Sequence, residues 1–193
     1  MPRARHWRIY KRYLAMSADR FFTALHRKFT NNLAHLNALD AAVGDGDHGS
    51  TMVRGLAKAV AADEGKRAKA FMRASGGASG TLFGLILIAI ETYLDSAADL
   101  TSGLATACDR ICDLGEVKVG DKSMIDALAP AVTAMKSGDL AAAISAARAG
   151  RDSTQPLVAR RGRAQYVEQG GKGHIDPGAV SVVIFLETLG ELD

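Results

Sequence analysis

Apolar residues recur at helical spacing along most of the chain. The first such face, after residue 18, consists of Phe22, Leu25, Phe29, Leu33 and Leu36. The second, after residue 51, consists of Val53, Leu56, Ala57 and Val60. Both stretches predict helices with one apolar side that packs against the rest of the protein.

The longest apolar run is Leu82–Ile90, and it follows the glycine-rich sequence GGASG at 76–80. The helix that it predicts is apolar on all sides, so we expect it to be the central and most buried helix. The run is about half as long as the ~18–20 residues of a membrane span, and the acidic Glu91 and Asp95 follow it. We therefore expect a core helix and no place in a membrane.

Two further helices are predicted in the second half of the chain. The first follows residues 120–123, ends near Gly138 and contains Pro130, which we expect to kink or interrupt it. The second is the alanine-rich stretch DLAAAISAARAG, for which Asp139 is the expected N-cap.

The last segment, DPGAVSVVIFLETLGEL, fits two structures. Its β-branched run would suit a buried strand, whereas Asp176 as a cap, Pro177 at the first helical position and the length of the segment favour a helix. The chain shows no alternation of strands with helices and no internal repeat. We therefore predict an all-α fold in which the helices pack as a bundle.

Composition narrows the class of protein. With 193 residues, 48% of them apolar and 23% charged, the chain suits one soluble domain that needs no disulfide. The net charge is only +3, which argues against a nucleic-acid binder. Cys108 and Cys112 are four positions apart, a poor spacing for a disulfide, and indicate buried thiols in a reducing, cytoplasmic setting.

Part of the positive charge lies at the start of the chain, in MPRARHWRIYKR. No apolar stretch of the length that a signal peptide needs follows these residues. We expect residues 1–18 to form a solvated, partly disordered leader and residues 19–193 to form a single domain.

Four glycine-containing turns each lead into a predicted helix: Gly44–Thr51, Gly76–Gly80, Gly120–Ser123 and Asp176–Gly178. A helix N-terminus offers unpaired N–H groups and a partial positive charge, and glycine lets the backbone approach a phosphate closely. Several such turns around one mouth would suit a nucleotide.

The first turn, GDGDHGST, carries carboxylates as well as glycines. It has the spelling of a dinucleotide-binding loop, but no strand precedes it. An EF-hand is excluded because the twelfth position from Asp45 is Leu56, where a bidentate Glu is needed. Asp40, Asp45 and Asp47 would repel one another unless a cation such as Mg²⁺ lay between them and a phosphate. The alternative is that Asp40 and Asp47 cap helices and Asp45 forms a turn.

Other polar side chains have more than one role open to them. His48 suits a general base, a metal ligand or a polar group packed under the loop, and His174 is similar. Ser79 and Ser123 can donate to phosphate or cap helices. The arginines at 160–163 can clamp phosphate or form a solvated face.

Five motifs occur in a fixed order: GDGDHG at 44–49, GGASGTLFG at 76–84, GDKSMIDAL at 120–128, RRGRAQY at 160–166 and GHIDPGAVS at 173–181. In this order they resemble the nucleotide-binding (L) subunit of dihydroxyacetone kinases, or the equivalent domain of single-chain enzymes of this family. The resemblance extends from about Asp40 to near the C-terminus, and the five motifs together are highly specific.

The resemblance implies a barrel-like bundle of about eight antiparallel helices with a nucleotide at one end. It implies that Asp40, Asp45 and Asp47 hold two Mg²⁺ ions that bridge to the phosphates. The residues that it implies beside the nucleotide are His48, Gly49, Ser50, Thr51, Ala78, Ser79, Gly115, Ser123, Met124, Arg163, Asp176, Pro177 and Gly178. Thr51 is a departure, because the family usually carries Asn at this position.

The resemblance also implies the chemistry and the partners. The dihydroxyacetone is held by a separate kinase subunit, and this chain supplies bound ADP or ATP with no catalytic side chain beyond the metal and phosphate ligands. In one branch of the family a phosphohistidine protein of the phosphotransferase system rephosphorylates bound ADP; in the other, ATP arrives from solution. The length of the chain favours the first branch. The alternatives are an ATP-dependent kinase subunit for another small sugar or ketose, and a nucleotide-sensing regulatory partner.

Overall fold

The computed structural model of the chain describes residues 3–137 and 139–192, with side chains from residue 17 onward. Its helices, in chain order, are α1 (Arg3–Ala41), α2 (His48–Val60), α3 (Arg67–Ser75), α4 (Gly77–Ser96), α5 (Leu100–Gly115), α6 (Ile125–Ser137), α7 (Leu140–Ser153), the short 3-10 helices η1 (Arg163–Tyr166) and η2 (Glu168–Gly171), and α8 (Pro177–Gly190). No β-strand occurs in the described residues, which confirms the all-α class and the helical choice for the last segment.

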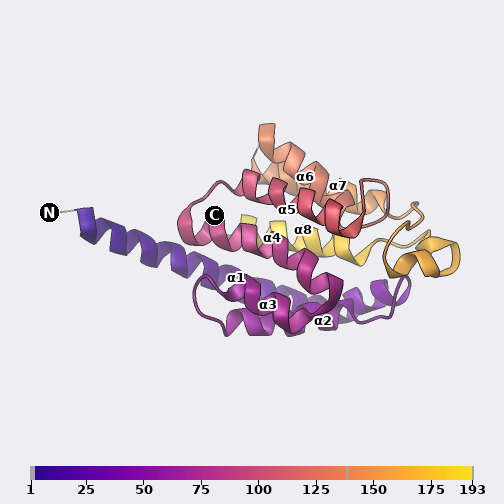
Figure 1. Ribbon diagram of the computed structural model, residues 1–193, viewed down its shortest axis with the longest axis horizontal. Helices are drawn as coiled ribbons and strands as arrows, with labels where there is room; N and C mark the ends of the chain where they lie inside the picture. Colours follow the sequence, from indigo (N-terminus) through magenta and orange to yellow (C-terminus); the bar gives the residue numbers. More distant parts are fainter. Residues whose placement is uncertain (1–2, 138, 193) are drawn as a thin grey trace.

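The α-helices pack in chain order and close on themselves. Each α-helix contacts the next one along the chain, and α8 contacts α1 as well as α7 (Figure 1). The closure of the ring between the last helix and the first confirms the barrel-like bundle that the motifs implied.

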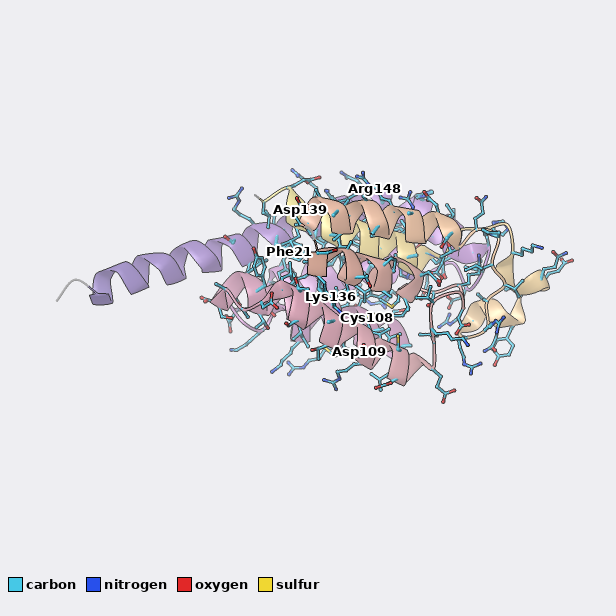
Figure 2. The ribbon with its side chains drawn as sticks, turned by 90° about the horizontal axis from the view of Figure 1, so that it is seen from above. Phe21, Cys108, Asp109, Lys136, Asp139 and Arg148 are labelled. Carbon is cyan, nitrogen blue, oxygen red and sulfur yellow. The ribbon has the colours of Figure 1, made fainter. Side chains whose placement is uncertain are left out.

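The N-terminal end of α1 projects from this bundle. Its first turns extend beyond the other helices in both views (Figure 1, Figure 2). The helix is continuous from Arg3 to Ala41, so its backbone shows no break at residue 18. The division of the chain into a leader and a domain stays a prediction.

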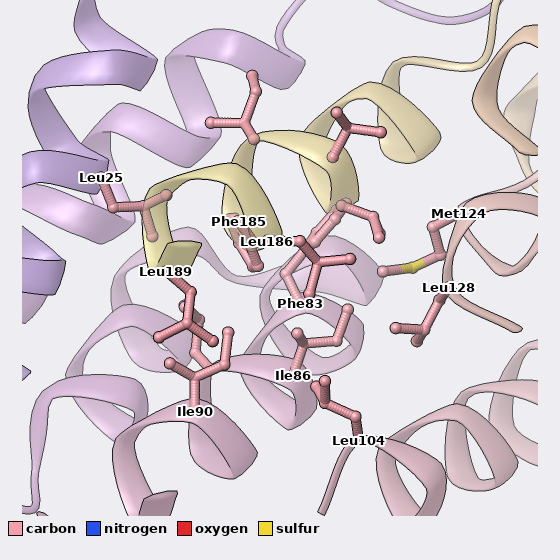
Figure 3. Packing of buried hydrophobic residues seen from close by; sticks show 14 of the residues in the cluster. Leu25, Phe83, Ile86, Ile90, Leu104, Met124, Leu128, Phe185, Leu186 and Leu189 are labelled. Atoms are coloured by element: carbon pink, nitrogen blue, oxygen red, sulfur yellow. The ribbon is translucent and has the colours of Figure 1, made fainter. Parts of the chain in front are cut away.

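Aromatic rings connect three helices in the interior. The Phe185 ring of α8 lies edge-on to Phe29 of α1 and to Phe83 of α4, with ring centroids 5.7 and 5.8 Å apart. Leucine and isoleucine side chains of α4 and α8 surround these rings (Figure 3). The interior is therefore a continuous apolar core.

The most buried helix is α8, and the expectation that the helix around Leu82–Ile90 would be the most buried one is wrong. Ten of the fourteen residues of α8 are buried, against eight of the twenty in α4. Thr81 and Thr92 on the outer side of α4 are exposed. Among the described helices, only α4 is long and apolar enough to cross a membrane. The core helix of a soluble bundle can have the same length and composition.

The structure shows the predicted N-caps of two helices and the effect of Pro130 on its helix. Asp139 accepts a hydrogen bond from Ala142 N (2.9 Å), and Asp176 accepts one from Ala179 N (2.7 Å). Both aspartates are therefore N-caps, as the sequence indicated. Helix α6 continues through Pro130 to Ser137, so this proline does not end the helix.

Candidate functional site

Four turns converge at one end of the bundle and surround a cleft of about 520 Å³. They are the α1–α2 turn, the α3–α4 turn, the α5–α6 loop and the turn before α8, and the segment around η1 covers one side. This end lies opposite to the projecting end of α1 (Figure 1). The glycine-containing turns thus share one mouth, as the sequence predicted.

Most of the predicted site residues line this cleft. The residues that do so are Asp40, Asp45, Asp47, His48, Thr51, Ala78, Ser79, Gly115, Ser123, Met124, Arg163, Asp176, Pro177 and Gly178. Gly49 and Ser50 do not, because they face α1. The N–H of Ser50 donates to Asn37 Oδ1 (3.0 Å), and a Cβ added to Gly49 would lie 2.5 Å from Leu33 O. The position of Gly49 and Ser50 does not support a direct contact with a nucleotide.

The three aspartates form a carboxylate cluster (Asp40, Asp45 and Asp47) at the mouth. Each offers one oxygen, and these oxygens all lie within 4.8 Å of one another. Asp40 Oδ2 accepts hydrogen bonds from Asp47 N (2.9 Å) and His48 N (3.1 Å), so Asp40 satisfies the first N–H groups of α2 from across the turn. Asp47 itself makes no side-chain capping bond. This set of hard oxygen donors fits Mg²⁺.

The arginines of residues 160–163 each face a carboxylate. Their ion pairs are Arg163 with Asp45, Arg161 with Glu116 (3.6 Å) and Arg160 with Asp121 (3.7 Å). Arg161 and Arg163 line the cleft, so they are placed to meet a phosphate, whereas Arg160 lies outside it. The pair with Asp45 places a cationic group beside the exposed side of the carboxylate cluster.

His48 is buried beneath the turn. Its Nε2 lies 2.7 Å from Ser181 Oγ on α8, and its ring centroid lies 5.5 Å from that of Phe83. Burial lowers the pKa of His48, although the nearby Asp40 and Asp47 oppose this shift. A neutral imidazole packed against α8 fits a structural role under the turn better than a general base or a metal ligand.

The α5–α6 loop is held by buried charged groups. The Asp126 carboxylate accepts from Gly120 N (2.5 Å) and Ser123 N (2.7 Å). The buried Lys122 Nζ donates to Thr154 O (2.8 Å) and to His174 O. Burial lowers the pKa of Lys122. These bonds fix the loop against the turn before α8, so both walls of the cleft are anchored.

Arg54 is a cleft residue that the sequence motifs did not single out. Its guanidinium donates to Ala74 O (3.0 Å), Ser75 O (3.1 Å) and Thr51 Oγ1 (3.1 Å). A signal was present in the sequence, because Asp47, Thr51 and Arg54 follow i, i+4 and i+7 spacing and share one face of α2. An apolar wall was missed as well; it consists of Leu82, Phe83, Ile111 and Val117.

Sequence comparisons identify relatives over nearly the whole chain. Residues 42–191 match the DAK2 domain. The chain is 33% identical to the PTS-dependent dihydroxyacetone kinase, ADP-binding subunit DhaL, of Lactococcus lactis, over 86% of this chain and 92% of that subunit. It is 31% identical to the PEP-dependent dihydroxyacetone kinase, ADP-binding subunit DhaL, of Escherichia coli, over 83% of this chain and 89% of that subunit. A longer relative is the L-erythrulose 1-kinase of Mycolicibacterium smegmatis, 36% identical over 83% of this chain and 33% of that protein.

A solved structure has the same fold. The crystal structure of the dihydroxyacetone kinase from C. freundii in complex with AMP-PNP and Mg²⁺ superposes with a TM-score of 0.69 at 27% identity. The superposition covers 93% of this chain and 34% of that one. This chain therefore corresponds to about a third of the length of that protein.

Proposed function

This chain belongs to the DAK2 domain family, and we propose that it is the ADP/ATP-binding subunit of a dihydroxyacetone kinase. One observation carries the proposal: the carboxylate cluster and the N-terminus of α4, which has no side-chain cap, face the same cleft. Relatives that the chain covers almost from end to end are ADP-binding subunits of such kinases. The chain is therefore a phosphotransferase component that acts on an alcohol group.

Three groups of cleft residues would hold different parts of a nucleotide. Asp40, Asp45 and Asp47 would hold two Mg²⁺ ions, which when bound neutralise phosphate charge during phosphoryl transfer. The backbone N–H groups of Ala78 and Ser79, in the first turn of α4, would donate to phosphate oxygens. The apolar wall formed by Leu82, Phe83, Ile111 and Val117 would take the base.

The acceptor would be bound by a second kinase subunit that docks over the mouth. Among the described residues, the large apolar side chains that are strongly exposed are Leu114, Val119, Val158 and Tyr166. Leu114 lies in the last turn of α5, Val119 and Val158 lie in loops, and Tyr166 ends η1. Residues next to Leu114, Val119 and Tyr166 in the chain line the cleft. Exposed apolar side chains gathered around one opening favour a protein partner there.

The phosphoryl donor would be a phosphohistidine protein of the phosphotransferase system, which recharges ADP in place. The PTS-dependent and PEP-dependent relatives support this donor. Free ATP is the alternative, and the two donors differ in whether the nucleotide leaves the cleft. Such partners would place the protein in the cytoplasm.

L-Erythrulose is a second candidate acceptor, because the relative from Mycolicibacterium smegmatis is an L-erythrulose 1-kinase at 36% identity. The acceptor would bind to the partner, so the choice depends on that subunit. A nucleotide-sensing regulatory role would use the same cleft without transfer. Assays of this chain with candidate substrate subunits, each offered both ketoses, would separate these three functions.

The carboxylate cluster gives the sharpest test. In the double variant Asp45→Ala with Asp47→Ala, we expect Mg²⁺-dependent ADP binding to be lost in isothermal titration calorimetry, because two of the three oxygen donors are gone. The helical circular dichroism spectrum should be unchanged. The matched control is Asp109→Ala with Asp152→Ala, which removes two exposed carboxylates outside the cleft. Equal ADP affinity in the cluster variant and the control would contradict the proposal.

A further inference from the structure

Arg54 connects three segments of the mouth through one guanidinium. It lies on α2, yet its Nε donates to Ala74 O and its Nη2 donates to Ser75 O, both at the end of α3. The same Nη2 donates to Thr51 Oγ1 one turn earlier on α2. Arg54 therefore ties the helix that follows the carboxylate cluster to the chain that leads into α4.

The bonds to α3 fix the direction of the chain at the α3–α4 turn (residues 75–79). The last carbonyl groups of a helix have no partner within the helix, and a cation that binds them also stabilises the negative end of the helix dipole. Directly after these carbonyls, Gly76 adopts φ 67° and ψ 177°, a conformation open in practice only to glycine. By holding Ala74 O and Ser75 O, Arg54 sets where Gly77 and Ala78 begin α4.

The bond to Thr51 reaches the carboxylate cluster. Thr51 is buried, and its hydroxyl lies 3.4 Å from Asp47 Oδ2, a long hydrogen bond. Because Arg54 donates to the same Oγ1 atom, the hydroxyl hydrogen is directed away from the guanidinium and toward Asp47. Arg54 thus orients Asp47 through Thr51.

We propose that Arg54 is a positioning residue that fixes the separation between the carboxylate cluster and the α3–α4 turn. The inference rests on the proposed function, in which the cluster holds Mg²⁺ and the turn receives the phosphates of the same nucleotide. A nucleotide that spans two such elements binds best when their separation is set in advance. Lysine cannot replace arginine here, because a single ammonium group does not present the planar fork that meets Ala74 O, Ser75 O and Thr51 Oγ1 together.

The test compares ADP binding by Arg54→Lys and by the unaltered chain, with Mg²⁺ and with EDTA. Loss of a residue that orients metal ligands typically costs about 10- to 100-fold in affinity, and we expect a loss of this size with Mg²⁺. With EDTA the loss should be clearly smaller, because ADP then contacts only the α3–α4 turn and no longer spans the turn and the carboxylate cluster. An equal loss under both conditions would show a direct phosphate contact and overturn the positioning role, and so would no loss at all.

The matched control is Arg148→Lys. Arg148 pairs with Glu187 across α7 and α8, outside the cleft and on the outer face of the bundle (Figure 2). The substitution makes the same chemical change at another contact between helices. We expect no change in ADP affinity with Mg²⁺ or with EDTA.

Thr51 supplies a second variant that leaves Arg54 and the fold in place. Thr51→Val removes the hydroxyl, and we expect about a three- to ten-fold loss of Mg²⁺-dependent affinity. Thr51→Ser keeps the hydroxyl and should restore binding. Because the two residues act on Asp47 together, the losses for Arg54→Lys and Thr51→Val should not add in the double variant. Full additivity would contradict the path through Thr51.

A measurement without nucleotide separates this inference from the proposed function. Amide hydrogen exchange at residues 77–79 of the free protein should be faster in Arg54→Lys, because the turn has lost its anchor, and unchanged in Thr51→Val. If the unaltered chain bound no ADP with Mg²⁺, the proposed function would fail, while the exchange rates would still decide the role of Arg54. Unchanged exchange in Arg54→Lys would overturn the inference.

Discussion

Helices α4 and α8 both begin at the cleft, but their first turns are built differently. Helix α8 starts with Asp176, which accepts from Ala179 N, and with Pro177, which has no N–H. Helix α4 starts after Gly76, which has no side chain to cap it, and its first turn is open to the cleft. The α8 terminus already satisfies its own donors, so only the α4 terminus has donors to spare for a phosphate.

This difference assigns the two walls of the cleft to different tasks. An anion at α8 would meet the Asp176 side chain, which already occupies the Ala179 N–H, while an anion at α4 would meet backbone N–H groups and the positive end of the helix dipole. Arg54 holds the chain that enters α4, through its bonds to Ala74 O and Ser75 O. The proposed site therefore has the phosphates at the N-terminus of α4 and uses α8 as a wall of the cleft.

A negative charge in the first turn of α4 should make this terminus as unfavourable for a phosphate as the α8 terminus. For Ala78→Asp we expect the new carboxylate to repel a phosphate by about 2–4 kcal/mol, roughly a thirty-fold loss of ADP affinity or more. The free protein should gain about 0.3–1 kcal/mol of stability, because an acidic side chain favours a helix N-terminus. The matched control is Ala141→Asp, at the same helical position of α7, where the helix begins outside the cleft. Calorimetry and thermal unfolding measure both effects; unchanged ADP affinity in Ala78→Asp would place the phosphates elsewhere.

The cap of α8 should make stability depend on pH. Burial raises the pKa of Asp176 to about 7, although the hydrogen bond from Ala179 N and the charge of Lys122 oppose the shift. The folded protein therefore holds a proton that the unfolded chain releases near pH 4, so stability falls as pH rises from about 4 to about 7. Asp176→Asn removes this dependence and keeps a capping side chain. In thermal unfolding at pH 5 to 8, the melting temperature of the unaltered protein should fall relative to that of Asp176→Asn as pH rises.

A second cap gives the control for this pH dependence. Asp99 caps α5, and hydrogen bonds from the Ser102 side chain and backbone lower its pKa. Its carboxylate stays ionised across the same range, so Asp99→Asn should differ from the unaltered protein by a constant amount. A constant difference for Asp176→Asn as well would contradict the assignment of a buried, proton-holding cap to α8.

The smallest effect is expected from one hydroxyl at α4. The Ser79 hydroxyl makes no hydrogen bond to any described residue, and Ser79 lines the cleft. If it donates to a phosphate, Ser79→Ala should cost about 1 kcal/mol of binding, close to five-fold in ADP affinity. The control is Ser102→Ala, at the same third helical position of α5 and outside the cleft. Equal ADP affinities of Ser79→Ala and Ser102→Ala would mean that α4 contacts a phosphate only through its backbone N–H groups.

Local signals predicted much of the fold and the outline of the site. Asp176 and Pro177 together favoured a helix over a strand for the last segment, because a cap and a proline at the first position act on neighbouring residues. The carboxylate cluster was predictable for the same reason, since Asp40, Asp45 and Asp47 lie within eight residues of one another. Chemistry confined to one turn is visible in the sequence.

Features that depend on distant contacts were not predictable. The rotation of α2, which turns Ser50 away from the cleft, is fixed by a contact with Asn37 on α1. The role of Arg54 depends on the carbonyl groups of Ala74 and Ser75, about twenty positions away. The greater burial of α8 is a different case, because α8 is on average more apolar than α4 and the sequence therefore carried that signal.

The most direct measurement is a crystal structure of this protein grown with AMP-PNP and Mn²⁺ in place of Mg²⁺. The anomalous signal of Mn²⁺ locates each metal ion independently of the nucleotide. We expect two peaks held by the carboxylate cluster, with the phosphates at the N-terminus of α4 and the base against the apolar wall. No peak at Asp40, Asp45 and Asp47, or phosphates at the N-terminus of α8, would contradict the account.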